Sequence, residues 1–221
     1  MDKIKLGVLV GGTSIEREVS KKSCENLLAN LDENKYDITV YHLPADGNTE
    51  WAKNIISNPP QIVLSALHGG NGENGSIQGF LHCLNIPYIG SKVLSSAICM
   101  NKAMAKTVMK ANHIQVPDHV FVMRGVDFSQ YEESIKLMGF PLIVKPNRGG
   151  SSIGVIVARN MEDIHYGIKN IMETYDDDVL IEKFIDGKEI NCCVLQGENG
   201  PEAMAVLDVK KAGSVFVYDD K

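Results

Sequence analysis

The sequence predicts an α/β fold in which a doubly wound parallel sheet is followed by an α+β unit. Its first 90 residues alternate between short apolar runs and segments with helical spacing, which is the rhythm of βαβ units. Residues 179–209 instead contain three successive strand patterns separated by DG and ENG turns. The length of 221 residues also exceeds that of one typical domain, so more than one structural unit is expected.

The first strand is predicted at KLGVLV (5–10), a continuous apolar run that suits a strand buried on both faces. Apolar and small residues at helical spacing from Val19 to Leu31 predict a helix after it. Further strands are expected at 37–43, 62–67 and 86–91, with helices near 51–56 and 75–84. The loops GGTSIERE and HGGNGENG then fall at the carboxyl ends of parallel strands, where ligands of such sheets bind.

The second half of the chain mixes the two kinds of element. We expect helices at 94–112, 127–138 and 161–174, and strands at 116–122, 141–146, 152–158, 179–185, 189–195 and 202–209. These assignments divide the chain into residues 1–92, 93–185 and 186–221, the last being the start of a truncated unit.

Composition excludes several classes of protein. The net charge of −6 and the lack of Lys/Arg runs argue against nucleic-acid and membrane partners. The apolar run near the N-terminus is too short for a membrane span and has no signal-peptide cleavage pattern, so we expect a cytoplasmic protein. The five cysteines form no CxxC pair, which predicts reduced and mostly buried thiols.

Residues 144–155, VKPNRGGSSIGV, predict a phosphate-binding loop of an unusual kind. In a Walker loop the lysine follows the glycines and the loop leads into a helix. Here Lys145 precedes Gly149 and Gly150, and the loop joins two predicted strands. Such a hairpin can place backbone N–H groups over phosphates beside a fixed positive charge. A glycine-rich surface hairpin with an incidental lysine is the alternative.

Together, Lys102 in MNKAMAK, Lys145 before GGSS and the segment LIEKFIDGKE (180–189) resemble the nucleotide site of ATP-grasp enzymes. With GGTSIEREVS (11–20), LHGGNGENGSIQG (67–79) and PNRGGSSIGV (146–155), the chain is similar over its full length to the D-alanine–D-alanine ligase family. The resemblance implies an N-terminal pre-ATP-grasp domain that binds substrate, a central ATP-grasp subdomain and the beginning of a C-terminal one.

The resemblance also implies a function. Members of this family join two D-alanines with ATP through an acyl phosphate, releasing ADP and phosphate, to make a peptidoglycan precursor. ATP and Mg2+ (or Mn2+) are the implied cofactors, and a cytoplasmic homodimer is the implied assembly. A ligase that uses D-lactate or D-serine as second substrate stays open, as does a non-catalytic nucleotide-binding fragment of the ligase.

Three residues match the family's first-substrate site. Glu16 corresponds to a glutamate that binds the ammonium of the first D-alanine, and a carboxylate suits that task because charge-assisted hydrogen bonds are strong. His68 matches a histidine near this substrate, and Ser151 a serine that positions it in a network with Glu16. Glu16 and Ser151 are thus the implied catalytic residues. A helix-start acid and a structural histidine are the simpler interpretations of Glu16 and His68.

The resemblance assigns the remaining residues to ATP. Lys102 and Lys145 match lysines on the phosphates, the adenine segment is expected at 182–185, and Glu189 matches a glutamate on the ribose. The full set is Lys102, Lys145, Gly150, Ser151, Ser152, Glu182, Lys183, Phe184, Ile185, Glu189 and Lys221, the last in a loop that covers ATP.

No metal ligand is assigned within the chain. Glu189 and Asn191 have the ExN form of the family's magnesium motif, but they directly follow LIEKFIDGK, where the family binds ribose. Family members continue past the position of Lys221, and the resemblance puts the metal ligands and an oxyanion arginine there. We therefore expect the 221-residue chain alone to lack appreciable ligase activity.

Overall fold

The computed structural model describes residues 2–209. The chain divides into two compact units: one comprises residues up to Ile114 together with Asn147–Gly149, and the other comprises Gln115–Pro146 and the residues from Gly150 onward. The boundaries expected at residues 92 and 185 stay predictions. The described part contains no helix long and apolar enough to cross a bilayer.

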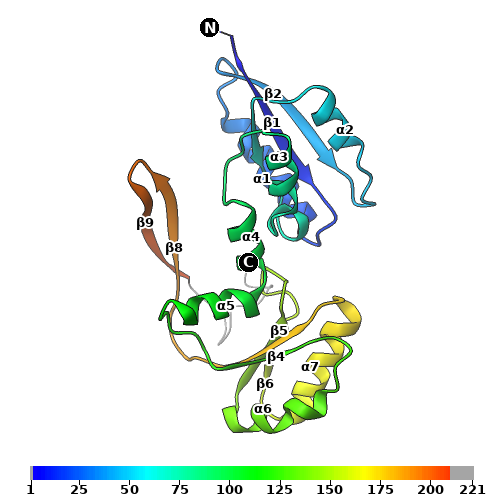
Figure 1. Ribbon diagram of the computed structural model, residues 1–221, viewed down its shortest axis with the longest axis vertical. Helices are drawn as coiled ribbons and strands as arrows, with labels where there is room; N and C mark the ends of the chain where they lie inside the picture. The colour runs from blue at the N-terminus through cyan, green and yellow to red at the C-terminus, as the bar shows by residue number, and fades with distance from the viewer. Residues whose placement is uncertain (1, 210–221) are drawn as a thin grey trace. The chain divides into compact units, whose positions relative to one another are not determined.

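The first unit is built on a parallel sheet with strand order β2-β1-β3 (Figure 1). The central strand, β1 (Ile4–Gly11), pairs in parallel with β2 (Tyr36–Leu43) and β3 (Ile62–Ser65). Its last six residues are all buried, as the continuous apolar run predicts for a strand covered on both faces.

Helices cover both faces of this sheet, so the predicted doubly wound arrangement is confirmed. On one face, Leu6, Val8 and Val10 pack with Cys24 of helix α1 (Arg17–Asn30). The other face packs Leu9 against residues of α2 (Glu50–Ser57) and α3 (Ser76–Cys83). The unit also contains the short 3-10 helix η1 (Gly70–Gly72), α4 (Val93–Met100) and α5 (Lys102–Ala111).

Two sequence-based assignments in this unit are wrong in detail. Residues 86–91 form no strand; Tyr88 makes a single parallel bridge to Val63. Pro87 stands in this stretch, and because proline has no N–H to donate, it cannot extend a ladder. The long helix expected at 94–112 is two helices, because Asn101 has an extended conformation and its side chain accepts a hydrogen bond from Met104 N, capping α5.

The second unit contains a four-stranded antiparallel sheet with order β4-β7-β5-β6. Its elements are β4 (His119–Val122), the 3-10 helix η2 (Phe128–Tyr131), α6 (Glu132–Met138), β5 (Leu142–Pro146), β6 (Ile156–Ala158), α7 (Met161–Thr174) and β7 (Val179–Lys183). One core cluster joins Ile135 of α6 and Ile164, Ile168 and Ile171 of α7 to the sheet residues Val144 and Ile181. Helix α7 therefore covers one face of the sheet.

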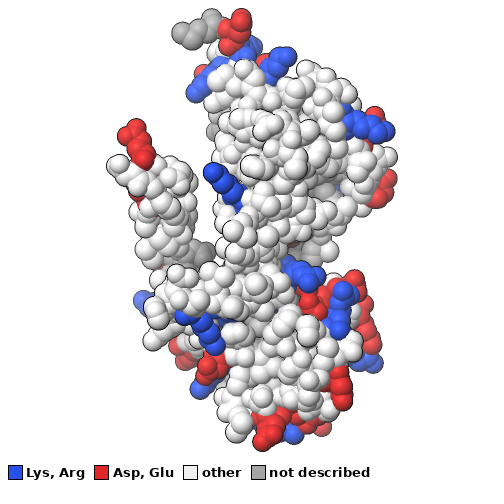
Figure 2. Space-filling view, viewed as in Figure 1, with Lys and Arg blue, Asp and Glu red and all other residues white. Residues whose placement is uncertain are grey.

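The last described elements are β8 (Glu189–Gly197) and β9 (Gly200–Val209), which form a separate two-stranded antiparallel sheet. Side chains on both faces are exposed, including six large apolar residues: Ile190, Val194, Leu195, Met204, Val206 and Leu207. Figure 2 shows the visible side of this hairpin as mostly uncharged, with acidic side chains at its tip.

Three further expectations in the second half need correction. The strand expected at 152–158 begins only at Ile156, because Ser151 and Ser152 have left-handed backbones. The strand expected at 179–185 ends at Lys183. Of the five free cysteines only Cys24 is buried, and burial raises the pKa of its thiol; the expectation of mostly buried thiols is wrong.

Candidate active site

The loop that follows β1 sets the geometry at the carboxyl end of the parallel sheet. Gly11 has a φ of +94°, and a Cβ there would lie 2.5 Å from the carbonyl oxygen of Leu43. The N–H of Gly11 donates to Ser20 Oγ at 2.8 Å, and Ser20 is fully buried on α1. The strand end is thereby fixed to the helix, so residues 12–16 turn sharply over the edge of the sheet.

Glu16 lies at the end of this turn, at the N-cap position of α1, and is only 9% exposed. Its backbone N–H donates to Ser14 Oγ at 3.1 Å, and its carbonyl accepts from Ser20 N at 3.1 Å. Its side chain does not cap the helix. Glu16 is thus a largely buried carboxylate at the start of α1, at the carboxyl end of the parallel sheet.

The Glu16 carboxylate lies against the loop after β3. Gly69 has a φ of +65°, and a Cβ there would be 2.6 Å from Glu16 Oε2 and 2.6 Å from Ser14 Oγ. A Cβ at this position would require the Glu16 and Ser14 side chains to move, and the positive φ is also strained for residues other than glycine, so glycine lets the two loops meet as they do. The structure thus brings together GGTSIERE and the start of HGGNGENG, as expected for the ends of neighbouring parallel strands.

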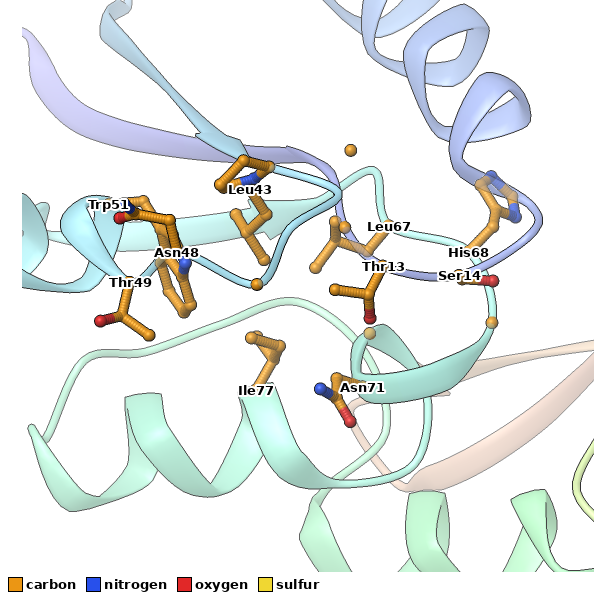
Figure 3. Close-up of a pocket in the computed structure, with 16 residues that line it drawn as sticks. Thr13, Ser14, Leu43, Asn48, Thr49, Trp51, Leu67, His68, Asn71 and Ile77 are labelled. Carbon is orange, nitrogen blue, oxygen red and sulfur yellow. The ribbon is translucent and has the colours of Figure 1, made fainter. Parts of the chain in front are cut away.

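His68 precedes Gly69 and is half-buried. Its Nε2 lies 2.8 Å from Ser23 Oγ of α1. Figure 3 shows the imidazole directed toward α1, beside Ser14. The ring is therefore held by the same helix that begins at Glu16.

A cavity of about 130 Å3 opens next to these residues, at the ends of β1, β2 and β3. Figure 3 shows apolar and polar side chains around it. Its apolar lining residues include Leu43, Trp51, Leu67 and Ile77, and its polar ones Thr13, Ser14, Asn48, Thr49, His68 and Asn71. A small molecule with both apolar and polar groups suits such a lining.

Lys102 begins α5, in the same unit as Asn147–Gly149. Its ammonium donates to the carbonyls of Gly149 and Asn147. Asn147 is fully buried and receives hydrogen bonds from Lys102 N at its carbonyl and from Ala103 N at Oδ1, both at 3.0 Å. Lys102 is therefore tied to the glycine-rich loop, while N–H groups of the first turn of α5 are already used within the protein.

In the second unit, Lys145 lies at the end of β5 and forms an ion pair with Glu182 of β7. The antiparallel register pairs Lys145 with Leu180 and Ile143 with Glu182. Lys145 and Glu182 consequently share one face of the sheet, opposite the face covered by α7. Two residues predicted to bind ATP are thus in direct contact.

The stretch after Lys145 is a tight turn. Ser151 and Ser152 have φ values of +51° and +58°, and Ile153 N donates to Gly150 O at 3.1 Å. A Cβ on Gly154 would lie 2.9 Å from the ring of Tyr175 and 3.0 Å from Pro146. These two left-handed residues form a turn, and turns can present backbone N–H groups to an anion.

The predicted adenine segment follows along β7. Lys183 N donates to Asp118 O at 2.9 Å, and Phe184 N to Pro141 O at 3.3 Å, so these two donors are already used. Ile185 is 64% exposed. Glu189 opens β8 and pairs with Val209.

Two family models match this sequence. One, described as D-ala D-ala ligase C-terminus, matches residues 108–221, and the other, D-ala D-ala ligase N-terminus, matches residues 49–91. The D-alanine–D-alanine ligase of Bacillus anthracis is 38% identical over 219 residues, covering 99% of this chain and 68% of the relative. The chain belongs to the D-alanine–D-alanine ligase family.

Further members of the family are similar to this chain in sequence and in structure. D-alanine–D-alanine ligase B of Clostridium perfringens is 35% identical over 229 residues, again 99% of this chain and 68% of the relative. The crystal structure of the Bacillus anthracis ligase complexed with ATP has a TM-score of 0.82 at 33% identity, covering 96% of this chain and 68% of that one. The D-Ala:D-Ser ligase VanG of Enterococcus faecalis has a TM-score of 0.82 at 27% identity, with 100% and 74% covered. The ATP-grasp fold class is thereby confirmed.

Within this family assignment, the structure brings some predicted residues together. Glu16 and the loop at His68 meet in the first unit, as do Lys102 and Gly149, while Lys145 meets Glu182 in the second. Ser151 belongs to the second unit. Lys221 lies outside the described residues. The individual roles of these residues stay predictions.

Sequence reasoning missed Ser20, Ser23, Gly69 and Asn147, which hold the site residues in place. A signal for the serines was present: Glu16, Ser20 and Ser23 are spaced i, i+4, i+7, which puts all three on one helix face. Gly69 and Asn147 had no comparable signal, because their partners are distant in sequence.

Proposed function

We propose that the complete product of the gene that encodes this chain carries out the reaction of its family: ATP-dependent joining of two D-alanines into D-alanyl-D-alanine, a peptidoglycan precursor. The observation that carries the proposal is the family match over 99% of the chain, at 38% identity to the Bacillus anthracis ligase. The contact between Glu16 and the Gly69 loop supports it, because a buried carboxylate beside a small cavity suits an amino-acid ammonium.

The proposed reaction has two steps. The carboxylate of the first D-alanine takes the γ-phosphoryl group of ATP, giving an acyl phosphate and ADP. The amine of the second D-alanine then attacks the acyl carbon, and phosphate leaves from the tetrahedral intermediate as the amide forms. Phosphoryl transfer depends mainly on positioning and on neutralising charge between anionic groups.

The chain supplies groups for both tasks. Glu16 binds the ammonium of the first D-alanine, His68 lies beside it, and Ser151 positions it. Lys102 and Lys145 neutralise phosphate charge, and the amides of Gly150 and Ser152 bind phosphate oxygens. The ion pair between Lys145 and Glu182 places two of the proposed ATP-binding side chains together on one sheet face.

The remaining ATP contacts in the proposal involve the end of β7 and the start of β8. Residues 182–185 receive adenine, with the exposed Ile185 giving an apolar contact, and Glu189 binds the ribose. The role of Lys221 belongs to the same proposal. ATP binding by the Bacillus anthracis relative supports these assignments.

Mg2+ or Mn2+ belongs to the proposal as the ion that neutralises the ATP phosphates. The residues that the structure describes contain no group of three or more His, Cys, Asp or Glu side chains able to hold a metal. The family resemblance, and not this absence, is the reason that the proposal assigns no residue of 2–209 to the ion. The proposal also includes a cytoplasmic homodimer; light scattering on the purified protein would test the assembly.

A D-Ala:D-Ser ligase is the second candidate, favoured by the likeness to VanG at a TM-score of 0.82 over the whole chain. The two reactions share the first substrate and differ in the second. Competition between D-alanine and D-serine, with products identified by mass spectrometry, distinguishes them.

The test uses the complete product of the gene that encodes this chain, with ATP, D-alanine and Mg2+, and follows phosphate release and the dipeptide. Glu16→Gln should raise the KM for the first D-alanine about 10- to 100-fold and leave the KM for ATP nearly unchanged, because it removes a charged hydrogen-bond partner of the ammonium. Lys145→Ala should weaken ATP binding instead. Absence of dipeptide with either second substrate would contradict the proposed function.

A further inference from the structure

One face of α1 carries three polar residues, Glu16, Ser20 and Ser23, toward the carboxyl ends of the strands. Their spacing of i, i+4 and i+7 places them in a row. Ser20 Oγ accepts a hydrogen bond from Gly11 N at the end of β1, and Ser23 Oγ lies 2.8 Å from His68 Nε2 after β3. The helix that presents Glu16 thus also holds the only other first-unit residue assigned to the first substrate.

We propose that Ser23 is a positioning residue: its hydroxyl donates to His68 Nε2 and holds the neutral ring with its proton on Nδ1, where it meets the carboxylate of the first D-alanine. This proposal rests on the proposed function for the identity of the substrate. It concerns a residue for which the family resemblance supplied no role.

The hydrogen-bonding capacity of the His68 ring limits which of its nitrogens can face a ligand. A neutral imidazole has one N–H donor and one acceptor nitrogen, and the hydrogen bond made by one nitrogen sets the proton on the other. Ser23 occupies Nε2, so a ligand that approaches His68 meets Nδ1. A carboxylate only accepts hydrogen bonds, so His68 can bind one through Nδ1 only if Nδ1 carries the proton. Nε2 is then the acceptor nitrogen of the neutral ring, and the Ser23 hydroxyl must donate to it.

The simpler interpretation is that Ser23 and His68 merely fasten α1 to the loop. The helix is already fastened without them. Ser20 bonds the end of β1, and Cys24, with Leu27 and Leu28 beside it, packs into the apolar cluster under the sheet. Because these contacts already attach α1 to the sheet, we assign the Ser23–His68 hydrogen bond to the orientation of the ring.

The surroundings of His68 make its orientation matter. The next residue, Gly69, is in contact with the Glu16 carboxylate and Ser14, and His68 lines the cavity beside them. The backbone there cannot shift without disturbing Glu16. Ring rotation is therefore the main freedom left to His68, and Ser23 removes it.

Kinetics of the complete gene product test the proposal with four variants: Ser23→Ala, Ser23→Thr, His68→Gln and the control Ser95→Ala. Ser95 Oγ donates to Lys92 O at 2.9 Å on α4, so its replacement also loses one hydroxyl hydrogen bond, but away from the cavity. Ser23→Ala should raise the KM for the first D-alanine about 3- to 10-fold, the usual effect of one hydrogen bond, without changing the KM for ATP. Ser23→Thr should restore it, and Ser95→Ala should match the parent.

Nitrogen-15 spectra of the histidine rings give a readout that does not depend on turnover. The His68 signals are identified by their loss in His68→Gln and followed to the pH range where the ring is neutral. The parent and Ser23→Thr should show the Nδ1–H form, and Ser23→Ala a mixture. An Nε2–H form in the parent, a ratio unchanged in Ser23→Ala, or an unchanged KM would overturn the proposal. Failure of the proposed function would instead appear as ATP use by the parent that does not depend on D-alanine.

Discussion

At the scale of single residues, the proposed first-substrate site depends on a glycine that carries no chemistry. Gly69 combines a φ of +65° with a backbone so close to Glu16 that a Cβ would lie 2.6 Å from Oε2. Left-handed backbone is costly for other residues, and here the space is also absent. Its neighbour Gly70 has a φ of +48°, but a Cβ there would find Ser14 Cβ only at 3.6 Å, an ordinary contact.

We predict that Gly69→Ala displaces the Glu16 carboxylate and raises the KM for the first D-alanine at least about 10-fold, a loss comparable to that of a charged hydrogen bond. Gly70→Ala is the matched control, since it introduces the same methyl group at a positive φ without the clash. Steady-state kinetics of both variants in the complete gene product make the comparison. Equal KM values would show that Glu16 tolerates displacement or does not bind the substrate.

At the scale of helices and strands, close packing of α7 on the sheet also requires a glycine. Gly167 lies in the middle of α7, and a Cβ there would be 2.9 Å from Cγ1 of Val144, a fully buried residue of β5. On α3, Gly79 has no atom within 4 Å of the corresponding position. Both glycines are helical, but only a Cβ at Gly167 would meet a neighbouring side chain at short distance.

Gly167→Ala should lower the free energy of unfolding of the second unit by about 1 kcal/mol, since overpacking costs roughly 1–3 kcal/mol and alanine returns roughly 1 kcal/mol of helix propensity. Gly79→Ala should raise stability slightly, because only the propensity changes. Thermal or urea unfolding measures both. Shifts of the same sign in the two variants would mean that Val144 yields to the added methyl group.

The elements also show what sequence could and could not predict. The run at 5–10 identified β1 because full burial requires continuous apolar residues. The strand expected at 86–91 is reduced to one bridge because Pro87 has no N–H with which to extend the pairing. The helix expected at 94–112 is divided in two because Asn101 caps α5. At the site, strand ends predicted the positions of Glu16 and His68. The contacts of Gly69 and Ser23 depend on how two loops and a helix meet in space.

At the scale of the whole molecule, the three sheets differ in how well they are covered. Helices cover both faces of the parallel sheet, and α7 covers one face of the four-stranded sheet. The β8–β9 sheet is exposed on both faces, with apolar side chains such as Val194 and Leu207 more than half exposed. An isolated two-stranded sheet has marginal stability, because its cross-strand hydrogen bonds gain little from apolar burial.

The rates of amide hydrogen exchange in the 221-residue chain should therefore differ between the three sheets. Amides that bond β8 to β9 should exchange on the order of 10²-fold or more faster than those of β1 and β5, since local opening of the hairpin exposes little buried surface while opening of β1 exposes both cores of its unit. Mass spectrometry of peptides covering residues 4–11, 142–146 and 189–209 would measure this. Equal slow exchange in all three would require another protein surface to cover the hairpin, and repeating the measurement at several protein concentrations would reveal whether a second copy of the chain provides it.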